Sequence, residues 1–249
     1  MKANVTIKAL SAAVLGLAGM AFAGSSFAAC ALSDPAKPIG AWDAKSVLGG
    51  AITLTDPGLA ASGCKMSASI TSAAFGSAFV RDNTPASETR YRAKFLVDAD
   101  ALTGLNSVQT VRLLSVNTDT PYLGISEAVR LSVLGNLAGT AKSLGVAAAC
   151  EGQPSNLCSG TVALGATGTQ VIQIDWVKGA SGSVKVWVNN TNEATPNLTL
   201  SGNTNGWVVD YTTMGLSNPS PGFRNATTGQ LNRIVQFDEF DSRRTTFIN

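Results

Sequence analysis

Hydrophobic and polar residues alternate most regularly in the stretch VIQIDWVKGASGSVKVWVNN, residues 171–190. In its first half, Ile172, Ile174 and Trp176 fall on one side of an extended chain, and in its second half every other residue is valine. Alternation with a period of two indicates strands that bury one face. Residues 179–182 between the halves are the small residues that turns use. We therefore predict a hairpin with one face in a core that contains Trp176.

The same pattern occurs along most of the chain. In ETRYRAKFLVD, residues 88–98, the basic residues alternate with apolar ones. Further strands are predicted at 51–55, 108–116, 128–134, 142–150, 159–164, 197–200, 207–214 and 231–240. These strands are short and bounded by Gly, Pro, Asn or Ser, and the chain after residue 28 has no amphipathic helix of ten residues. We expect an all-β fold, a two-sheet antiparallel sandwich of jelly-roll type.

The first 28 residues have the features of a secretory signal peptide. Lys2 and Lys8 precede an apolar run at 9–23. The run is followed by small residues that form a cleavage site, with cleavage after Ala28. No later stretch reaches the ~20 apolar residues of a membrane-spanning helix. We predict secretion to the periplasm or the extracellular space, and the alanine-rich style is typical of bacterial export.

Four cysteines, an even number, suit an oxidising compartment. Three pairings are possible, and we favour Cys30–Cys64 with Cys150–Cys158 because the last two enclose the short turn EGQPSNL. The alternative is a lipoprotein acylated at Cys30, which would leave one other cysteine unpaired. The predicted organisation is a signal peptide (1–28), an extended N-terminal segment tied by a disulfide (29–64) and a β-sandwich domain (65–249).

Charge and composition exclude several functions. Loss of Lys2 and Lys8 with the leader leaves equal numbers of basic and acidic residues, which argues against nucleic acid or anionic membrane as a partner. The chain has no histidine. This excludes Ser-His-Asp and Cys-His nucleophiles and histidine-bound zinc or iron.

The stretch VIQIDWVKGASGSVKVWVNN resembles the strand pair of laminin-G-like, concanavalin A-like domains. In that family a tryptophan ends one strand, and a hydrophobic-aromatic-Val-Asp-Gly run forms the next. Here Asn-Asn replaces Asp-Gly. MGLSN at 214–218 and VQFDEFDSRR at 235–244 resemble the closing segment of the family, so that the match covers about the last 75 residues. RDNTPASETRYRAKFLVD fits an early strand of bacterial secreted members. The resemblance implies a concanavalin A-like sandwich, a fold that hosts lectins, hydrolases and structural modules.

Hydrolases of that superfamily carry an E-x-D-x-E pattern on one strand. Its counterpart here begins at Glu239 and continues to Asp241, but Arg243 replaces the third acid. We therefore predict no catalytic residues and no enzymatic activity. The alternative for these acids is cross-strand pairing between the first and last strands of the sandwich. That pairing would join Asp238, Glu239 and Asp241 to Arg90, Arg92 and Lys94.

Laminin-G-like and related lectin domains often hold one Ca²⁺, which prefers six to eight oxygen ligands. Asp98 and Asp100 are the predicted ligands, with Asn203, Asn205 and Asp210 as further candidates. Solvated loop residues are the alternative interpretation of all five.

Exposed aromatic rings can stack on sugars. Trp187 lies on the polar side of its strand by alternation, beside Lys185 and Asn189, and Trp207 follows an Asn-Gly turn. These four residues are the predicted ligand-binding set. The alternative is that Trp187 packs beneath a loop, because tryptophans are usually largely buried.

These observations predict an exported, non-catalytic module that binds a polysaccharide, a cell-surface glycan or another extracellular polymer. The first alternative is a structural, self-associating or protein-binding extracellular domain. The second is a carboxylate-dependent glycoside hydrolase or lyase.

Overall fold

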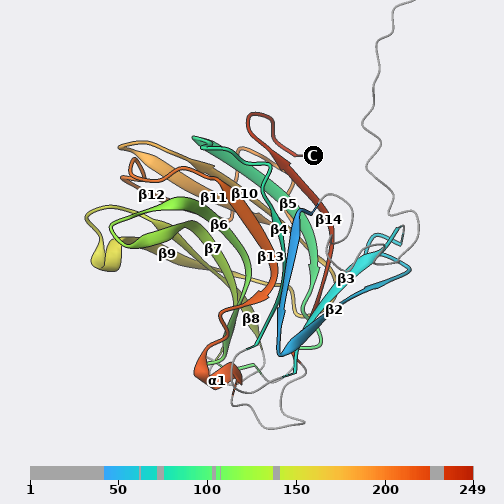
Figure 1. Ribbon diagram of the computed structural model, residues 1–249. Coiled ribbons are helices and arrows are strands. Elements are labelled where there is room, and N and C mark those ends of the chain that lie inside the picture. The colour runs from blue at the N-terminus through green and yellow to red at the C-terminus, as the bar shows by residue number, and fades with distance from the viewer. Residues whose placement is uncertain are drawn as a thin grey trace, which may run out of the picture.

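The computed structural model describes residues 42–61, 63–71, 76–102, 105–106, 108–136, 141–224 and 233–248, and these form two packed antiparallel sheets (Figure 1). The first, sheet A, contains β1 (Ala44–Leu48), β4 (Ser77–Asp82), β13 (Tyr211–Ser217), β6 (Thr110–Tyr122), β7 (Ile125–Gly135), β8 (Lys142–Ala149) and β9 (Leu157–Ala163), in that order. The second, sheet B, contains β12 (Leu198–Gly202), β11 (Gly182–Val188), β10 (Gln170–Val177), β5 (Arg90–Asp98), β14 (Ile234–Arg243), β3 (Lys65–Ile70) and β2 (Gly50–Thr55). Within the described ranges, the helical structure consists of two short turns, η1 (Pro154–Asn156) and α1 (Pro221–Arg224).

The described strands form two antiparallel sheets, so the predicted two-sheet antiparallel sandwich is confirmed. Each sheet contains strands from both halves of the chain. The predicted signal peptide lies outside the described residues and stays a prediction. The range 29–64, predicted to be an extended segment before the sandwich, contains β1 and β2. These are strands of sheet A and sheet B, respectively. None of the described helices is long and apolar enough to cross a membrane.

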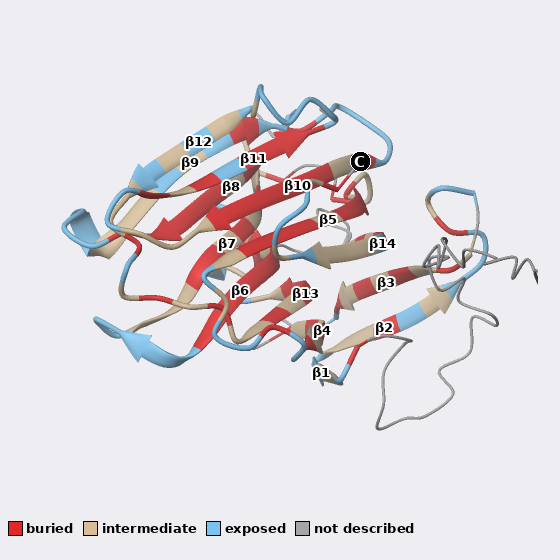
Figure 2. Cartoon of the chain, turned by 90° about the horizontal axis from the view of Figure 1, so that it is seen from above, coloured by how far each residue is buried: buried red, intermediate tan, exposed pale blue. Residues whose placement is uncertain are grey.

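The core lies between the sheets and follows the alternation of the sequence (Figure 2). Tyr91, Phe95, Ile174 and Trp176 are completely buried, and Val186 on β11 joins them. β11, β10 and β5 are neighbours, so their inward residues form one continuous apolar layer. Full burial of such side chains contributes roughly 1.5–3 kcal/mol each. The predicted hairpin and its buried face are confirmed.

β14 lies beside β5, as the sequence predicted for the first and last strands of the sandwich. The predicted ion pairs between them are not formed. The register shifts between Asp238 and Asp241, where Glu239 has a positive φ of 48°. Asp238 instead accepts a hydrogen bond from the backbone of Leu59, and Asp241 binds Arg243 on its own strand.

The arginines of β5 find their partners on the other side. Asp175 of β10 is directly opposite Arg92, and both Arg90 and Arg92 donate to its carboxylate. The prediction was wrong because these charged groups have nearer partners: Asp175 on the neighbouring strand takes both arginines, and Arg243 takes Asp241, although the register places Asp241 opposite Lys94.

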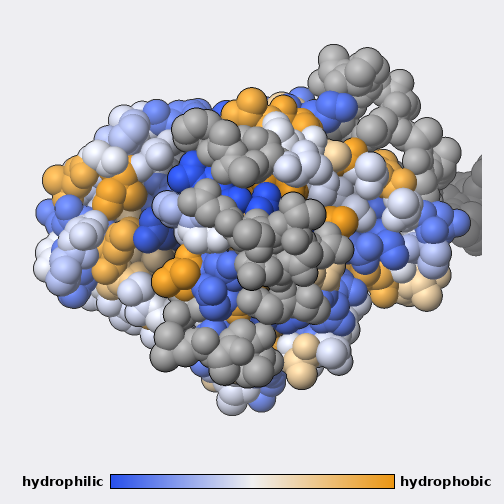
Figure 3. All heavy atoms as spheres, turned by 90° about the horizontal axis from the view of Figure 1, so that it is seen from below, coloured by the Kyte–Doolittle hydropathy of each residue, from blue (hydrophilic) through white to orange (hydrophobic). Residues whose placement is uncertain are grey.

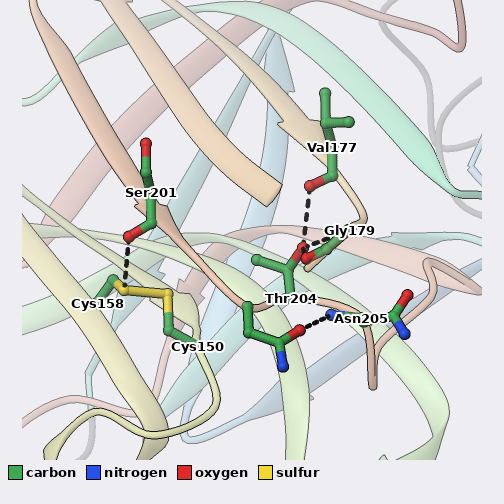
Figure 4. Close-up of a disulfide and its surroundings, with 8 residues drawn as sticks. Cys150, Cys158, Val177, Gly179, Ser201, Thr204 and Asn205 are labelled. Carbon is green, nitrogen blue, oxygen red and sulfur yellow. Dashed lines mark hydrogen bonds between the residues drawn. A yellow bond between two sulfur atoms is a disulfide. The ribbon is translucent and has the colours of Figure 1, made fainter. Parts of the chain in front are cut away.

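The predicted disulfide between Cys150 and Cys158 is confirmed, and it joins the ends of β8 and β9 with Cα atoms 5.5 Å apart (Figure 4). A sulfur of the bridge approaches the carbonyl of Ser201 on β12, at 3.6 Å. An added Cβ at Gly202 would lie 3.0 Å from both sulfurs, so the bridge packs on the backbone there. Cys64 is not a free thiol, and Cys30, its predicted partner, lies outside the described residues.

Candidate functional site

A groove of about 820 Å³ opens on the outer face of sheet A, over β6, β7, β8 and β9 and beside α1. The same alternation that buries Val111 and Leu131 turns Arg112 and Arg130 outward into it. Figure 3 shows the end of the molecule where α1 lies, with clusters of hydrophilic side chains between hydrophobic patches. The groove therefore lies on the outside of the core sheet, and its lining mixes polar residues with apolar ones such as Leu48, Leu134 and Pro221.

Its floor is made of small residues. Gly145 and Ala147 of β8 and Gly160 of β9 line it. A Cβ added at Gly145 would come within 2.8 Å of the Leu134 side chain, which also lines the groove. The missing side chain of Gly145 leaves space above β8 open for a ligand, whereas a side chain at Gly160 would point toward Leu198 and Leu200 of sheet B.

The charged residues of the lining are all basic. Among the described lining residues the ionisable ones are Arg112, Arg130 and Arg224, and none is acidic. Serine and threonine hydroxyls supply most of the remaining polar groups, at Ser77, Thr110, Ser132, Ser159, Thr161 and Ser220. Guanidinium groups stay protonated and present forked N–H donors that match carboxylates and phosphates. The groove is thus suited to an anionic, hydroxyl-rich ligand.

Strand register brings two of these arginines together. Arg130 of β7 is the cross-strand partner of Ser115 on β6, and Ser132 of β7 is the partner of Arg112. Glu127 reaches both arginines from β7: its Oε1 pairs with Arg112 Nη1 and its Oε2 lies 3.8 Å from Arg130 Nη1. Ser115 Oγ also donates to Glu127 Oε1, at 3.1 Å. Two cations therefore share one anion.

Burial is the main influence on Arg112. It lowers the pKa of Arg112 below its ordinary value; Glu127 opposes this effect and the positive charge of Arg130 adds to it. Only 18% of the Arg112 side chain is exposed, against 35% for Arg130. The pair thus keeps a positive charge in a site from which water is partly excluded, where charge interactions are stronger than in bulk water.

A second polar group lies on the same face, further along the sheet. Tyr211 of β13 is paired with Asn117 of β6. Asn117 lies two residues beyond Ser115, the cross-strand partner of Arg130. The Arg81 guanidinium lies 3.6 Å from the centre of the Tyr211 ring and 3.7 Å from Asp119. A phenol therefore shares this face with the arginine pair.

The predicted sugar-stacking tryptophans are both buried, which corrects the expectation of exposed rings. Trp187 is 1% exposed, donates to the carbonyl of Asn192 at 2.9 Å and meets the ring of Phe247 edge-on. Trp207 is fully buried and donates to the carbonyl of Ile125. The alternative interpretation of Trp187, packing beneath a loop, describes its position.

The other predicted ligand-binding residues lie on sheet B or at its end, outside the groove. Lys185 is exposed on β11, opposite Asp175. Asn189 accepts a hydrogen bond from the backbone of Val171 and donates to Gln170. A ligand role for Lys185 and Asn189 stays a prediction.

The predicted calcium ligands are engaged within the protein. Asp98 accepts a hydrogen bond from the backbone of Asp100, and Asp100 accepts one from the backbone of Gly168. The ammonium of Lys142 lies 3.4 Å from Asp100. In the part of the chain that the structure describes, no three Asp, Glu, Cys or His side chains gather as a metal site. Calcium binding stays a prediction.

The arginine pair was not predicted from the sequence. Its signal is present, because β6 and β7 both contain Val-Arg-Leu, and both place the arginine on the polar side of an alternating strand. The balanced net charge of the chain gave no reason to look for a local group of basic residues. A balanced total does not exclude a local excess of one sign.

No family model and no curated protein matches the sequence. Solved structures do resemble the fold. An endo-β-1,4-glucuronan lyase from the fungus Trichoderma reesei has a TM-score of 0.60 and 13% identity, over 84% of this chain and 94% of that one. The alginate lyase Aly36B has a TM-score of 0.52 and 11% identity, over 74% and 82%. A carbohydrate esterase from a Shiga toxin-encoding bacteriophage, phi24B, has a TM-score of 0.51 and 11% identity, over 82% and 91%.

At this level of identity the likeness concerns the fold. It nevertheless overturns the prediction of a protein without enzymatic activity. That prediction relied on the missing histidine and the incomplete E-x-D-x-E pattern, and structures of this fold include polysaccharide lyases. The absence of a hydrolase pattern is therefore no sign of a non-catalytic protein.

Proposed function

We propose that this protein is a polysaccharide lyase of the concanavalin A-like fold, which binds a uronate-containing polysaccharide in the groove on sheet A. The observation that carries the proposal is the lining of the groove, whose described residues include three arginines and no acidic residue. A uronate chain presents one carboxylate on each sugar and many hydroxyls, which match the arginines and the serine and threonine hydroxyls. The similar structures described as glucuronan and alginate lyases support the same substrate class.

The reaction that suits this lining is β-elimination. A base removes the proton at C5, next to the carboxylate, the C4–O bond breaks, and a C4–C5 double bond forms as the leaving oxygen takes up a proton. Arg112 and Arg130 would bind the carboxylate and stabilise the negative charge that develops on it as the proton leaves. No metal or redox cofactor is required for the balance of this step.

Proton transfer needs a further group, and the chain has no histidine to supply it. Tyr211 is our candidate, because a tyrosine can act as general acid or base and lies on the face that bears Arg130, beyond the described lining of the groove. Replacement of Tyr211 by Phe keeps the ring that supports Arg81 and removes the hydroxyl. We expect Tyr211→Phe to bind substrate normally and to lose most of the elimination rate.

We place this activity outside the cytoplasm. The predicted signal peptide and the Cys150–Cys158 disulfide favour an oxidising, exported location, where such polysaccharides occur.

The test is an incubation of the purified protein with polyglucuronate, alginate, pectate and a neutral glucan. Elimination creates a double bond conjugated to the carboxylate, so ultraviolet absorbance follows the reaction directly. We expect absorbance to rise with at least one polyuronate and not with the neutral glucan. Arg130→Ala should lower the affinity for that polyuronate by about 10- to 100-fold, the loss of a hydrogen bond to a charged group.

The matched control is Arg243→Ala, because Arg243 is an arginine of sheet B that binds Asp241 and lies away from the groove. It should leave both affinity and rate unchanged. If no polyuronate binds or is cleaved, the proposal is wrong. If polyuronate binds to the folded protein but absorbance does not rise under any of the conditions tested, the proposed elimination reaction is wrong.

A further inference from the structure

Glu127 is an acidic side chain beside a basic groove, and the proposed reaction gives it no task. It does not line the groove but reaches the two arginines from β7, and only 18% of its side chain is exposed. Arg112, Arg130 and Ser115 all contact its carboxylate. Three partners thus fix the position of one negative charge directly beside the ligand site.

The described contacts leave the arginines with spare donors and spare charge. Each guanidinium has five N–H donors, and Glu127 engages one nitrogen of Arg112 and one of Arg130. Two positive charges and one negative charge leave the cluster at +1. A ligand group with a single negative charge therefore completes the balance.

We infer that Glu127 sets the charge selectivity of the groove, and that it favours singly charged carboxylates over doubly charged groups such as phosphomonoesters. The inference rests on the proposed function, because it concerns ligands of the same groove. Coulomb repulsion grows with the product of the charges, so Glu127 penalises a dianion twice as much as a monoanion.

The experiment measures competition for a fluorescently labelled oligoglucuronate. The two competitors are glucuronate and glucose 6-phosphate, which carry one and two negative charges at the same position of the same ring. The assay runs at low ionic strength and at about pH 8, where a phosphomonoester is doubly charged. Wild type and Glu127→Gln are compared, and the readout is the ratio of the two competitor affinities.

In Glu127→Gln we expect glucuronate to bind about threefold more tightly and glucose 6-phosphate about tenfold more tightly, as one charge at ~6 Å in water predicts. The ratio therefore moves about threefold toward the phosphate. Glu127→Asp keeps the charge and should keep the wild-type ratio. Arg130→Gln leaves the remaining pair at zero charge and should move the ratio the opposite way, which provides the test if Glu127→Gln does not fold.

Asp241→Asn is the matched control, because it removes one carboxylate from an ion pair of sheet B. It should leave the ratio unchanged. Equal ratios in wild type, Glu127→Gln and Arg130→Gln would overturn the inference while the proposed function stands. Failure of the wild type to bind labelled oligosaccharides of polyglucuronate, alginate and pectate alike would overturn the proposed function, and this inference with it.

Discussion

The outer faces of the two sheets carry similar charged clusters in different balance. On sheet A, Arg112 and Arg130 share Glu127 beside an open groove. On sheet B, Arg90 and Arg92 bind Asp175, and Arg92 also binds Glu193 at 2.7 Å. The first cluster has an excess positive charge, whereas the second has as many acids as arginines.

The two clusters also differ in what covers them. Arg92 and Asp175 have side chains only 3% and 5% exposed. The residues after β14 lie over them: the Phe247 ring is 5.6 Å from the Arg92 guanidinium, and the backbone of Ile248 lies beside the Gln173 amide. A balanced and covered cluster holds the fold together. An unbalanced and open one is available to a ligand.

The largest effect should come from breaking the covered cluster. Asp175→Asn leaves Arg92 buried beside an uncharged amide, and loss of one partner from a buried ion pair costs about 3–5 kcal/mol. The matching change on the other face, Glu127→Gln, should cost about 1–2 kcal/mol, because its arginines keep contact with water. Urea unfolding of both variants measures the difference. Equal losses would show that the two clusters have the same structural role.

A smaller effect should follow from removing the cover. Phe247→Ala deletes a ring that meets Trp187 edge-on at 5.3 Å, and such a contact with its buried area contributes about 1–2 kcal/mol. All four tryptophans of the wild type are at most 8% exposed, so acrylamide should quench their fluorescence weakly. We expect stronger quenching in Phe247→Ala. As a control, Leu123→Ala changes a residue that is 52% exposed in the β6–β7 turn and should alter neither quantity.

These contacts show why the sequence predicted the fold better than the site. Alternation predicts which face of a strand is apolar, and it correctly placed Phe95, Ile174 and Trp176 in the core. It also placed Trp187 on the other face, and that too is correct. Its burial depends on Phe247, 60 residues away along the chain, and no local pattern predicts that contact.

The groove was missed for a related reason. Arg112 and Arg130 are both visible as outward residues of alternating strands, but their meeting depends on the pairing of β6 with β7. That pairing contains register shifts between Arg112 and Leu114, between Val116 and Asn117, and after Asn117, and bulges of this kind have no reliable signal in a single sequence. The acids of β14 were assigned to the wrong partners because the sequence does not show that β10 places Asp175 beside the arginines of β5.

The smallest effect concerns a carboxylate held by hydrogen bonds rather than by arginines. Asp210 precedes β13 and accepts hydrogen bonds from the backbone of Ser87 and Asp119 and from the hydroxyl of Thr118. Desolvation opposes ionisation, but these hydrogen bonds prevail and lower the pKa of Asp210 below its ordinary value. The charged form is therefore favoured in the folded state. Its contribution to stability is present above the ordinary pKa of an aspartate and is lost as the pH falls through the lowered value.

Asp210→Asn should thus lower the melting temperature slightly at neutral pH, and the difference from wild type should shrink as the solution becomes strongly acidic. Thermal unfolding of both proteins across that range provides the measurement. Asp119→Asn is the control, because its side chain is 68% exposed and the backbone amide that Asp210 binds is unchanged. A difference between Asp210→Asn and wild type that stays constant at every pH would mean that the shape of the hydrogen-bonded turn matters, and not the charge. Asp210 would then differ from Glu127 and Asp175, because the charge balance around those two carboxylates decides what their clusters do.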